Sequence, residues 1–363
     1  MKAYGISGNE LKFIESYIQN RRQYVELNGS TSNSLEIGAG VPQGSSLASY
    51  LYCLYVEGLL GTKNEQGECK TVMYSDDAFV MISGKNFQQL ESKANSTLKQ
   101  IYDWYSSNKL MLNAKKTKFM IFRPKGKQPC LTNLELGSIK IEQVHAPSTL
   151  KLLGVLFDEK LEFKLHAQHV LNKVAKSNYG LRLIKNFIPI SAKLMIYRSL
   201  IESHLTYCLP IWGRNLTSKT KAMFLQQQKR AMRFCHSKKG FSHTDALFQK
   251  SKILKFEHLL DLNCAQLLVD FKNRKLNWSF SSKLELCQPH ENMSTRSAAQ
   301  GFWKLPPGLS VCSLLNKFVQ IYNENMTIIK TSKSKNHFKS LFSEKVLSKY
   351  QTTCTNNQCT ECT

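Results

Sequence analysis

The sequence predicts an α+β protein in which strands and helices alternate at first and helices follow alone. Up to about Phe157, short apolar and β-branched runs alternate with amphipathic helical patterns. After Glu162 the strand patterns fade, and apolar residues recur at helical spacing. Pro189 and Pro210 fall between the helices predicted there, where a proline does not interrupt a helix.

In the first part, local patterns predict each element in turn. Asn9 is predicted to cap a short helix that has Leu11 and Ile14 on one face. Asn28-Gly29 indicates a hairpin, although the loop between its apolar strands is longer than two residues. Helices are predicted over residues 45–60 and 86–107, and strands over 71–74, 78–83, 119–122 and 152–157.

The second part is predicted to contain basic helices followed by a further helical region. Three amphipathic helices are expected over roughly residues 163–187, 191–207 and 218–236. Later helices are expected over 255–275, 311–322 and 337–350, with a polar linker over 279–309. The domains are therefore predicted at 1–158, 159–240 and 241–363.

The charge of the chain indicates a polyanionic partner. Its 363 residues include 50 Lys and Arg against 26 Asp and Glu, a formal net charge of +24. Residues 160–239 contain sixteen Lys or Arg and only two acids, Glu162 and Glu202. Because these basic residues interrupt apolar helical patterns, one helix face could pack while the other contacts phosphates.

For the first basic helix, the pattern assigns a different role to each face. Its expected buried residues are Leu165, Val170, Val174, Leu181 and Ile184. Its expected contacts to a nucleic-acid backbone are Lys173, Lys176, Arg182 and Lys185. His166 and His169 could together suit a metal or a phosphate, but we expect ordinary helix-surface residues.

No membrane or secretory signal is recognisable in the sequence. The longest apolar run, residues 47–60, is interrupted by Glu57 and is shorter than the ~20 residues that span a bilayer. Eleven cysteines lack the spacing of a disulfide framework, so we expect reduced thiols and a cytoplasmic or nuclear protein that is not secreted. The sequence does not predict an oligomeric state.

A carboxylate pair is the strongest chemical signal. Asp76 and Asp77 follow Tyr74-Ser75 and are flanked by apolar residues on both sides. Adjacent carboxylates repel each other, and a divalent metal commonly offsets that cost. About thirty residues earlier, Pro42, Gln43 and Gly44 form a turn that opens a helix.

In this order and at this distance, the two signals resemble the palm of a reverse transcriptase from a non-LTR retrotransposon (LINE-like, jockey/CR1-type). The resemblance continues through residues 108–117 and 152–155, and more loosely through Tyr207, Trp212-Gly213 and residues 301–306. It implies a partial polymerase palm, with an antiparallel sheet and helices. An all-α thumb and a helical carboxy-terminal region would follow.

The resemblance also implies catalytic roles. Asp76 would be the principal ligand of Mg²⁺, or of Mn²⁺ in its place, and Asp77 would assist. In such enzymes two metal ions stabilise the attacking and leaving oxygens of nucleotide addition. Lys116 is similar to the lysine proposed to protonate the pyrophosphate, and Lys115 beside it is the competing candidate.

Further residues would bind the substrates, an RNA template and a DNA primer. Pro42, Gln43 and Gly44 would line the template and nucleotide side, and Tyr74 lies beside the carboxylates. Leu153 and Gly154 would position the primer end, although both are equally suited to an ordinary strand.

The sequence departs from the family pattern in one respect. The family has another essential Asp upstream of the pair, but no Asp precedes Asp76 here. We therefore expect a domain truncated at the amino terminus, without fingers and inactive alone. The alternatives are a non-catalytic nucleic-acid-binding remnant and the product of a decayed element.

A cysteine cluster closes the chain. Cys354, Cys359 and Cys362 offer three thiolates, whereas a structural zinc site has four ligands. The sequence favours a disordered tail over a zinc site.

Overall fold

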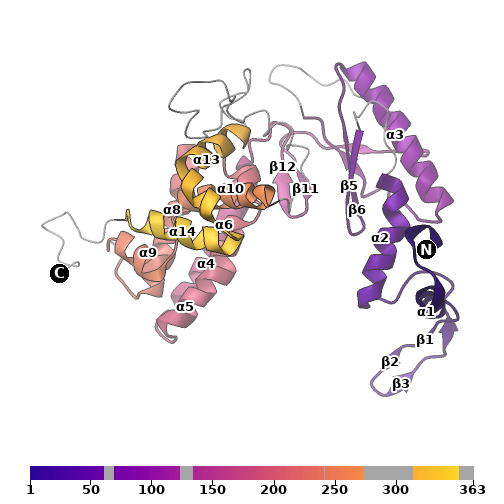
Figure 1. The fold of residues 1–363 in the computed structure, drawn as a ribbon, viewed down its shortest axis with the longest axis horizontal. Coiled ribbons are helices and arrows are strands. Elements are labelled where there is room, and N and C mark those ends of the chain that lie inside the picture. The colour runs from indigo at the N-terminus through magenta and orange to yellow at the C-terminus, as the bar shows by residue number, and fades with distance from the viewer. Residues whose placement is uncertain (61–68, 123–133, 241, 274–313, 351–363) are drawn as a thin grey trace, which may run out of the picture. The chain divides into compact units, whose positions relative to one another are not determined.

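The computed structural model describes residues 1–60, 69–122, 134–240, 242–273 and 314–350 (Figure 1). The chain forms two compact units. The first, the mixed unit, comprises residues 1–118 and 128–142, and the second, the helical unit, comprises residues 119–127 and 143–363. The mixture of helices and short antiparallel strands is compatible with the predicted α+β class.

The mixed unit begins with a short 3-10 helix η1 (Lys2–Tyr4) and helix α1 (Gly8–Ile18). Ser7, in extended backbone, precedes α1, so the predicted cap Asn9 is wrong because it lies inside the helix. Strands β1 (Arg22–Gln23) and β4 (Leu35–Glu36) pair, as do β2 (Glu26–Leu27) and β3 (Ser30–Thr31). Asn28 and Gly29, both at positive φ, close the inner pair as a two-residue turn, tighter than we expected.

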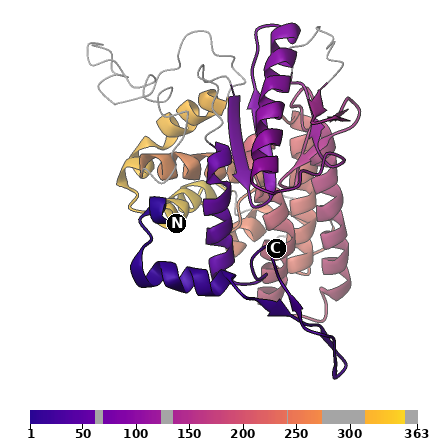
Figure 2. The ribbon, with the colours of Figure 1, turned by 90° about the vertical axis from the view of Figure 1, so that its right-hand side faces the viewer.

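A small core joins the central elements of this unit. Helix α2 (Ser46–Leu60) leads to strands β5 (Cys69–Tyr74) and β6 (Asp77–Ile82), and helix α3 (Phe87–Ser107) follows. Leu59, Ile101 and Tyr105 form the buried cluster, and Met73 and Val80 of the strands pack against it. Figures 1 and 2 both show α3 running alongside β5 and β6. Asn86, predicted as the first residue of this helix, instead caps α3 by accepting the Gln89 N–H at 2.8 Å.

The other strands are short and also pair in twos. These are β7 (Lys118–Phe119) with β10 (Glu142–Gln143), β8 (Glu135–Leu136) with β9 (Ile139–Lys140), and β11 (Leu150–Leu152) with β12 (Val155–Phe157). In the described ranges the strands form separate pairs instead of one larger sheet. The single strand predicted over 152–157 is wrong, because the chain reverses at Leu153 and Gly154.

Consecutive helices build the other unit. They are α4 (Lys164–Ile184), α5 (Ile190–Tyr197), the π-helical turn η2 (Arg198–Glu202), α6 (Ser203–Thr206), α7 (Leu209–Trp212), α8 (Ser218–Cys235), α9 (Asp245–Ser251), α10 (Phe256–Lys272), α13 (Leu314–Thr331) and α14 (Lys335–Leu347). The three predicted basic helices are confirmed as α4, the continuous run from α5 to α6, and α8. Helix α9 was not predicted.

An aromatic cluster fills the core of the helical unit. Trp212, Phe224 and Phe256 are fully buried. The Phe224 and Phe256 rings stack with centroids 4.5 Å apart, and the Trp212 ring lies 5.6 Å from Phe224. This core holds α7, α8 and α10 together.

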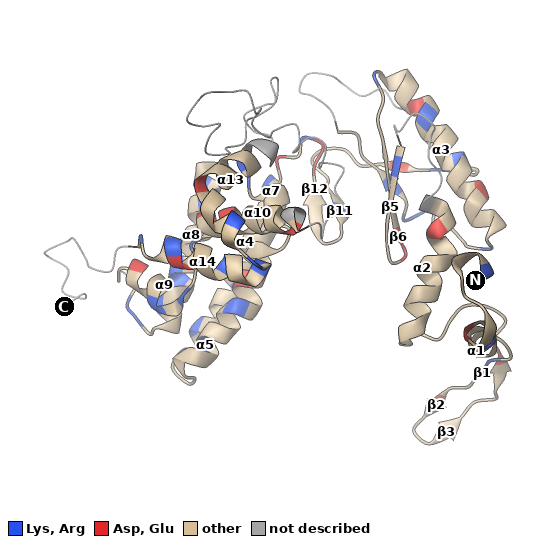
Figure 3. Ribbon diagram, viewed as in Figure 1, with Lys and Arg blue, Asp and Glu red and all other residues tan. Residues whose placement is uncertain are grey.

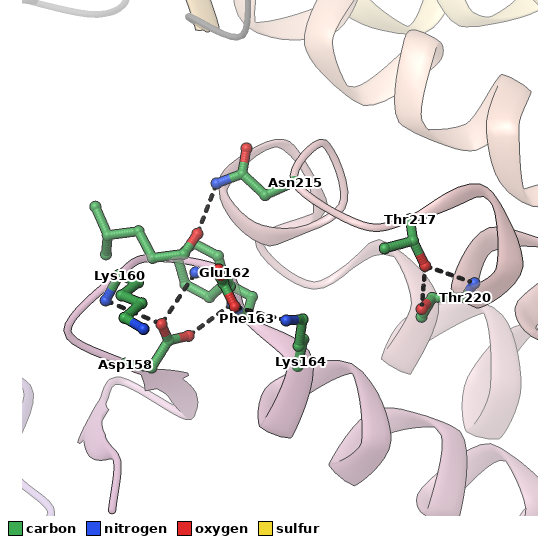
Figure 4. A network of polar contacts seen from close by, with 9 residues as sticks. Asp158, Lys160, Glu162, Phe163, Lys164, Asn215, Thr217 and Thr220 are labelled. Carbon is green, nitrogen blue, oxygen red and sulfur yellow. Dashed lines mark hydrogen bonds and ion pairs between the residues drawn. The ribbon is translucent and has the colours of Figure 1, made fainter. Parts of the chain in front are cut away.

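Asp158 fixes the start of α4 (Figure 4). One carboxylate oxygen accepts the N–H groups of Lys160 and Glu162 at 3.1 and 3.0 Å, and the other accepts that of Phe163 at 2.6 Å. Asn215 donates its side-chain amide to the Leu161 carbonyl at 2.7 Å. The loop before the first basic helix is therefore tied both to itself and to the segment before α8.

Burial along α4 agrees only in part with the predicted face. Val170, Val174 and Leu181 are buried, whereas Leu165 and Ile184 are 49% and 37% exposed, so their prediction is wrong. Leu165 lies two residues from buried Ala167, which places it on the opposite side of the helix. Ile184 is the last helical residue.

Among the helices of the described ranges, none has the length and apolar character needed to cross a bilayer.

Candidate active site and nucleic-acid interface

The register of β5 and β6 places the two carboxylates at and beside the hairpin tip. Tyr74 pairs with Asp77, so Ser75 and Asp76 alone form the turn. Ser75 has a φ of 53°, as a two-residue hairpin requires of at least its first turn residue. Asp77 already belongs to β6, one residue earlier than the predicted strand. Both carboxylates are exposed.

Only one face of this hairpin packs against the small core. Because directly paired residues share a face, Met73 and Val80 lie on the inward side. Val72 and Met81 lie on the other side and are 45% and 54% exposed. Asp77 shares this outward face with Tyr74, its cross-strand partner. The carboxylates are thus anchored in the core from one side of the hairpin.

The turn at residues 42–45 opens α2 as the sequence predicts. The Ser45 N–H donates to the Pro42 carbonyl at 3.4 Å, and Gly44 has a φ of 84°. A positive φ at the third residue of such a turn favours glycine. Gln43 and Gly44 are exposed, and Pro42 is half-buried.

Electrostatics connect Asp76 to the helix that this turn begins. Burial raises the pKa of Tyr52 in α2, and the negative charges of Asp76 and Cys53 raise it further. Asp76 therefore lies within electrostatic reach of Tyr52 in α2, the helix that follows the turn at residues 42–45. Tyr52 itself was missed, although its position four residues after buried Ala48 and four before buried Val56 could have indicated it.

Lys116 lies exposed in a turn after α3, where its N–H donates to the Asn113 carbonyl at 3.0 Å. Lys115, the competing candidate, is exposed in the same turn. In the part of the chain that the structure describes, no ion pair joins either lysine to Asp76 or Asp77.

The donor chemistry of the pair suits a hard divalent cation. Carboxylate oxygens are the ligands that Mg²⁺ prefers, and Mg²⁺ is commonly held by one or two carboxylates together with waters and substrate phosphates. Within the described ranges, no three His, Cys, Asp or Glu side chains are grouped to share one ion. Asp76 and Asp77 would therefore supply only part of a coordination shell. Cys354, Cys359 and Cys362 lie outside the described residues.

A second hairpin, β11–β12, holds the residues expected at the primer end. Leu153 and Gly154 form its turn with φ values of 44° and 86°. The Tyr207 hydroxyl donates to the Leu153 carbonyl at 2.5 Å. On the other strand, the Leu156 N–H donates to Nδ1 of His166 in α4 at 3.3 Å. Two side chains of the helical unit thus hold this hairpin.

Trp212 supports both of these side chains. Its Nε1–H donates to the Tyr207 carbonyl at 2.8 Å, and its ring meets the His166 ring edge-on, with centroids 5.2 Å apart. Trp212 is fully buried. The β11–β12 hairpin is therefore anchored in the main aromatic core. Sequence reasoning placed Tyr207 and Trp212 in the resemblance but missed the hydrogen bond of Tyr207 to Leu153 and that of Trp212 to Tyr207.

His166 is buried, so its prediction as a surface residue is wrong. Only 3% of it is exposed, because it falls on the packed stripe of α4 beside Ala167 and Val170. Burial, and then the nearby His169 and Lys173, lower its pKa to about 4. The ring is therefore neutral near pH 7, as its role of acceptor from Leu156 requires.

The basic residues predicted on α4 are mostly available to a ligand. Lys173, Lys176 and Arg182 are exposed, and Figure 3 colours the Lys and Arg positions along the ribbon blue. Lys185 is half-buried, and its ammonium lies 5.7 Å from the centre of the Phe234 ring. Lys193, by contrast, is buried and donates to the Lys185 carbonyl at 2.8 Å.

Comparisons with known proteins identify the family that the amino-terminal part of the chain resembles. The family model described as "Reverse transcriptase (RNA-dependent DNA polymerase)" matches residues 1–157. Residues 1–157 therefore match a reverse transcriptase domain, in agreement with the resemblance that the sequence predicts. The matched residues contain both the Pro42–Ser45 turn and the aspartate hairpin.

The relatives are polymerases of mobile elements. The chain is 27% identical to a "Probable RNA-directed DNA polymerase from transposon X-element" of Drosophila melanogaster, over 60% of this chain and 24% of that protein. It is 25% identical to the "RNA-directed DNA polymerase from mobile element jockey" of the same species, again over 60% and 24%. A "Retrovirus-related Pol polyprotein from type-1 retrotransposable element R1" of Nasonia vitripennis is 23% identical over 50% of this chain and 55% of that protein. The matched part of the chain thus spans about a quarter of the length of each of the first two relatives.

Proposed function

We propose that this reverse transcriptase domain supplies part of the palm of an RNA-directed DNA polymerase, and that the helical unit, as a thumb, binds the primer–template duplex. The observation that carries the proposal is the position of Asp76, at the tip of a tight hairpin and close to the helix opened by Pro42, Gln43 and Gly44. A turn that exposes carboxylates beside a substrate-side loop suits nucleotide addition.

Each group then has a separate task. Asp76 and Asp77 would hold Mg²⁺ or Mn²⁺, which stabilises charge on the attacking and leaving oxygens. Tyr74 shares the outward hairpin face with Asp77 and lies 64% exposed on the substrate side. Gly44 has no atom within 4 Å of the Cβ position it lacks, so the loop leaves room for a nucleotide.

The β11–β12 hairpin would bind the primer, and Lys116 would act on the leaving pyrophosphate. Leu153 and Gly154 would hold the primer end, because their turn is fixed by Tyr207. Lys116 would protonate the pyrophosphate only if substrate binding brought its turn to the carboxylates.

The resemblance implies a further carboxylate upstream of this pair for two-metal chemistry. No Asp precedes Asp76, and Asp76 and Asp77 belong to no larger metal-binding group among the described residues. We propose that the 363-residue chain expressed alone does not extend a primer.

A non-catalytic nucleic-acid-binding role is the second candidate. It is supported by the separation of the charges: the exposed lysines and arginine of α4 belong to the helical unit, and the aspartate hairpin belongs to the mixed unit. Binding of a duplex by the helices would not require the carboxylates.

The first test measures the metal and the reaction together. We expect Mn²⁺, added to the chain with a primer–template duplex and followed by electron paramagnetic resonance, to bind more weakly to Asp76→Asn than to wild type. Asp103→Asn, which removes another exposed carboxylate of the same unit, is the control. Equal Mn²⁺ binding by all three proteins would refute the metal site.

Primer extension on an RNA template with Mg²⁺ or Mn²⁺ then distinguishes the two candidates. We expect no product from the chain alone. A template-dependent product that disappears in Asp76→Ala would show that the chain is a complete polymerase after all.

The second test concerns the helical unit. Affinity for a primer–template duplex should fall steeply with salt, with a logarithmic slope of about 0.9 per phosphate neutralised on B-form DNA. Charge reversal at Lys173, Lys176 and Arg182 should weaken binding and flatten this slope. Lys333→Glu, an exposed lysine before α14, is the control. A shallow slope in wild type, or no loss on charge reversal, would leave these residues as solvated surface.

A further inference from the structure

We propose that Lys151, His169, Lys173 and His204 form one binding site for the phosphodiester backbone beside the turn of the β11–β12 hairpin. The proposal deepens the proposed function, because it takes the ligand of the helical unit to be a nucleic-acid strand. It goes further by placing one stretch of that strand at named groups on three elements.

The two anchors of the hairpin bring the histidines to it. His166 of α4 is bonded to β12, and His169 lies about one helical turn further along α4. Tyr207 follows α6 directly and is bonded to Leu153, and His204 lies about one turn before it. Each imidazole thus lies about one helical turn from a residue that is hydrogen-bonded to this hairpin.

Two lysines complete the cluster. Lys151 lies in β11, two residues before Leu153, and Lys173 lies four residues after His169 on the same side of α4. Lys151, His169 and Lys173 are exposed, and His204 is half-buried. The four groups therefore present a surface to solvent instead of a closed pocket.

Electrostatics link His169 to Lys151 and Lys173, and His204 to Lys173 and His169. Partial burial lowers the pKa of His169, and the charges of Lys173 and Lys151 lower it further. Partial burial also lowers the pKa of His204, and the charges of Lys173 and His169 lower it further. The charged groups that shift the two imidazoles are all basic, from β11, α4 and α6 alike.

An extended polyanion is the ligand that fits this arrangement. Four basic groups on an open surface can contact successive phosphates of a strand, whereas one small anion would remain largely in water. The groups carry no base-reading geometry, so binding should be independent of sequence. The site adjoins the turn proposed to hold the primer end.

The histidines give this site a property that lysine and arginine cannot provide. A bound phosphate favours the protonated imidazole, so it raises the pKa of His169 and His204 relative to the unliganded protein. Binding then takes up protons, and affinity must rise as the pH falls towards 6. The other charged or titratable groups facing this pair are Lys151, Lys173 and the buried His166.

The test follows binding of a fluorescent primer–template duplex to the full chain at fixed salt. Between about pH 8 and pH 6, we expect wild-type affinity to rise about fivefold or more, because each unit of pKa shift corresponds to tenfold in binding. In His169→Gln/His204→Gln this rise should be lost, with affinity at about pH 8 within about twofold of wild type. His243→Gln, an exposed histidine of the same unit, should behave as wild type.

A lysine variant tests the hairpin side of the site independently. Lys151→Gln should weaken binding at both pH values and lower the salt slope by about 0.9, the value for one phosphate on B-form DNA. Lys333→Gln is the matched control. Circular dichroism at each pH confirms that every variant is folded.

The outcomes separate this site from the wider proposal. Salt-dependent binding whose pH dependence is the same in wild type and the double histidine variant would overturn the site but leave duplex binding intact. Absence of duplex binding by wild type would overturn both.

Discussion

The stability of the helical unit should fall in mild acid because of His166. Its ring is 3% exposed, and its Nδ1 accepts a hydrogen bond from the Leu156 N–H. Protonation would remove that acceptor and place a charge beside Trp212, 5.2 Å away. Lowering the pH should therefore weaken the contact between α4 and the β11–β12 hairpin.

The sign and size of the effect follow from the pKa of His166. In the folded protein it is about 4, below the ordinary 6.5, so between these values the unfolded chain binds the extra proton. Stability is thus fully present above about pH 6.5 and is lost as the pH falls towards 4. A shift of about 2.5 units corresponds to at most ~3.4 kcal/mol. Because water screens the contributions of His169 and Lys173, we expect about 1–2 kcal/mol at pH 5.

Urea unfolding followed by circular dichroism measures this difference. The free energy of unfolding should fall between about pH 7.5 and pH 5 by about 1–2 kcal/mol more in wild type than in His166→Gln. The glutamine can still accept from Leu156 but does not titrate. His243→Gln is the control, since His243 is exposed. If wild type and His166→Gln lose the same free energy, His166 is not the titrating group.

Three further substitutions test the packing and the carboxylate pair. Gly180→Ala should stabilise the protein by about 0.5–1 kcal/mol, because Gly180 lies inside α4 with nothing within 4 Å of a new Cβ. Gly213→Ala should destabilise it by about 1–3 kcal/mol, because the new Cβ would lie 2.5 Å from buried Leu209; thermal denaturation of both variants checks this contrast. Asp77→Asn should keep the fold and slightly raise the melting temperature by relieving repulsion with Asp76. A substantial drop would instead indicate a structural partner for the carboxylate.

The helices could be predicted from the sequence because their signals are local and repeated. Apolar residues at helical spacing located α3, α4, α8 and α10 to within a few residues. The two-residue strands could not be found in this way, since so short an element has no period. The sequence also did not reveal that a strand ends at Leu153 and the chain turns there, because leucine rarely adopts a positive φ.

The candidate site was likewise predictable only where its features are local in the sequence. Asp76 and its turn are local in sequence, so the hairpin was predictable down to a shift of one residue at Asp77. The hydrogen bond from Tyr207 to Leu153 joins residues 54 positions apart, and the one from Leu156 in β12 to His166 depends on how α4 packs. Neither could be predicted from a local pattern. Periodicity alone could have placed His166 on the buried stripe, but it does not reveal which atom the ring contacts.

The two hairpins depend on cores of very different extent, and this separates the two tasks of the proposed polymerase. The aspartate hairpin packs one face on the small cluster around Leu59 and Ile101, while its other face is largely exposed. The primer-side hairpin is tied through Trp212 to the main core of the helical unit. A metal ligand at a turn tip can adjust to substrate when its support is light, whereas a primer end must be held in register with the helices that bind the duplex. Substitutions at the aspartates should therefore change metal binding with little effect on the helical unit. Substitutions around Trp212 should lower both the affinity for the duplex and the stability of the helical unit.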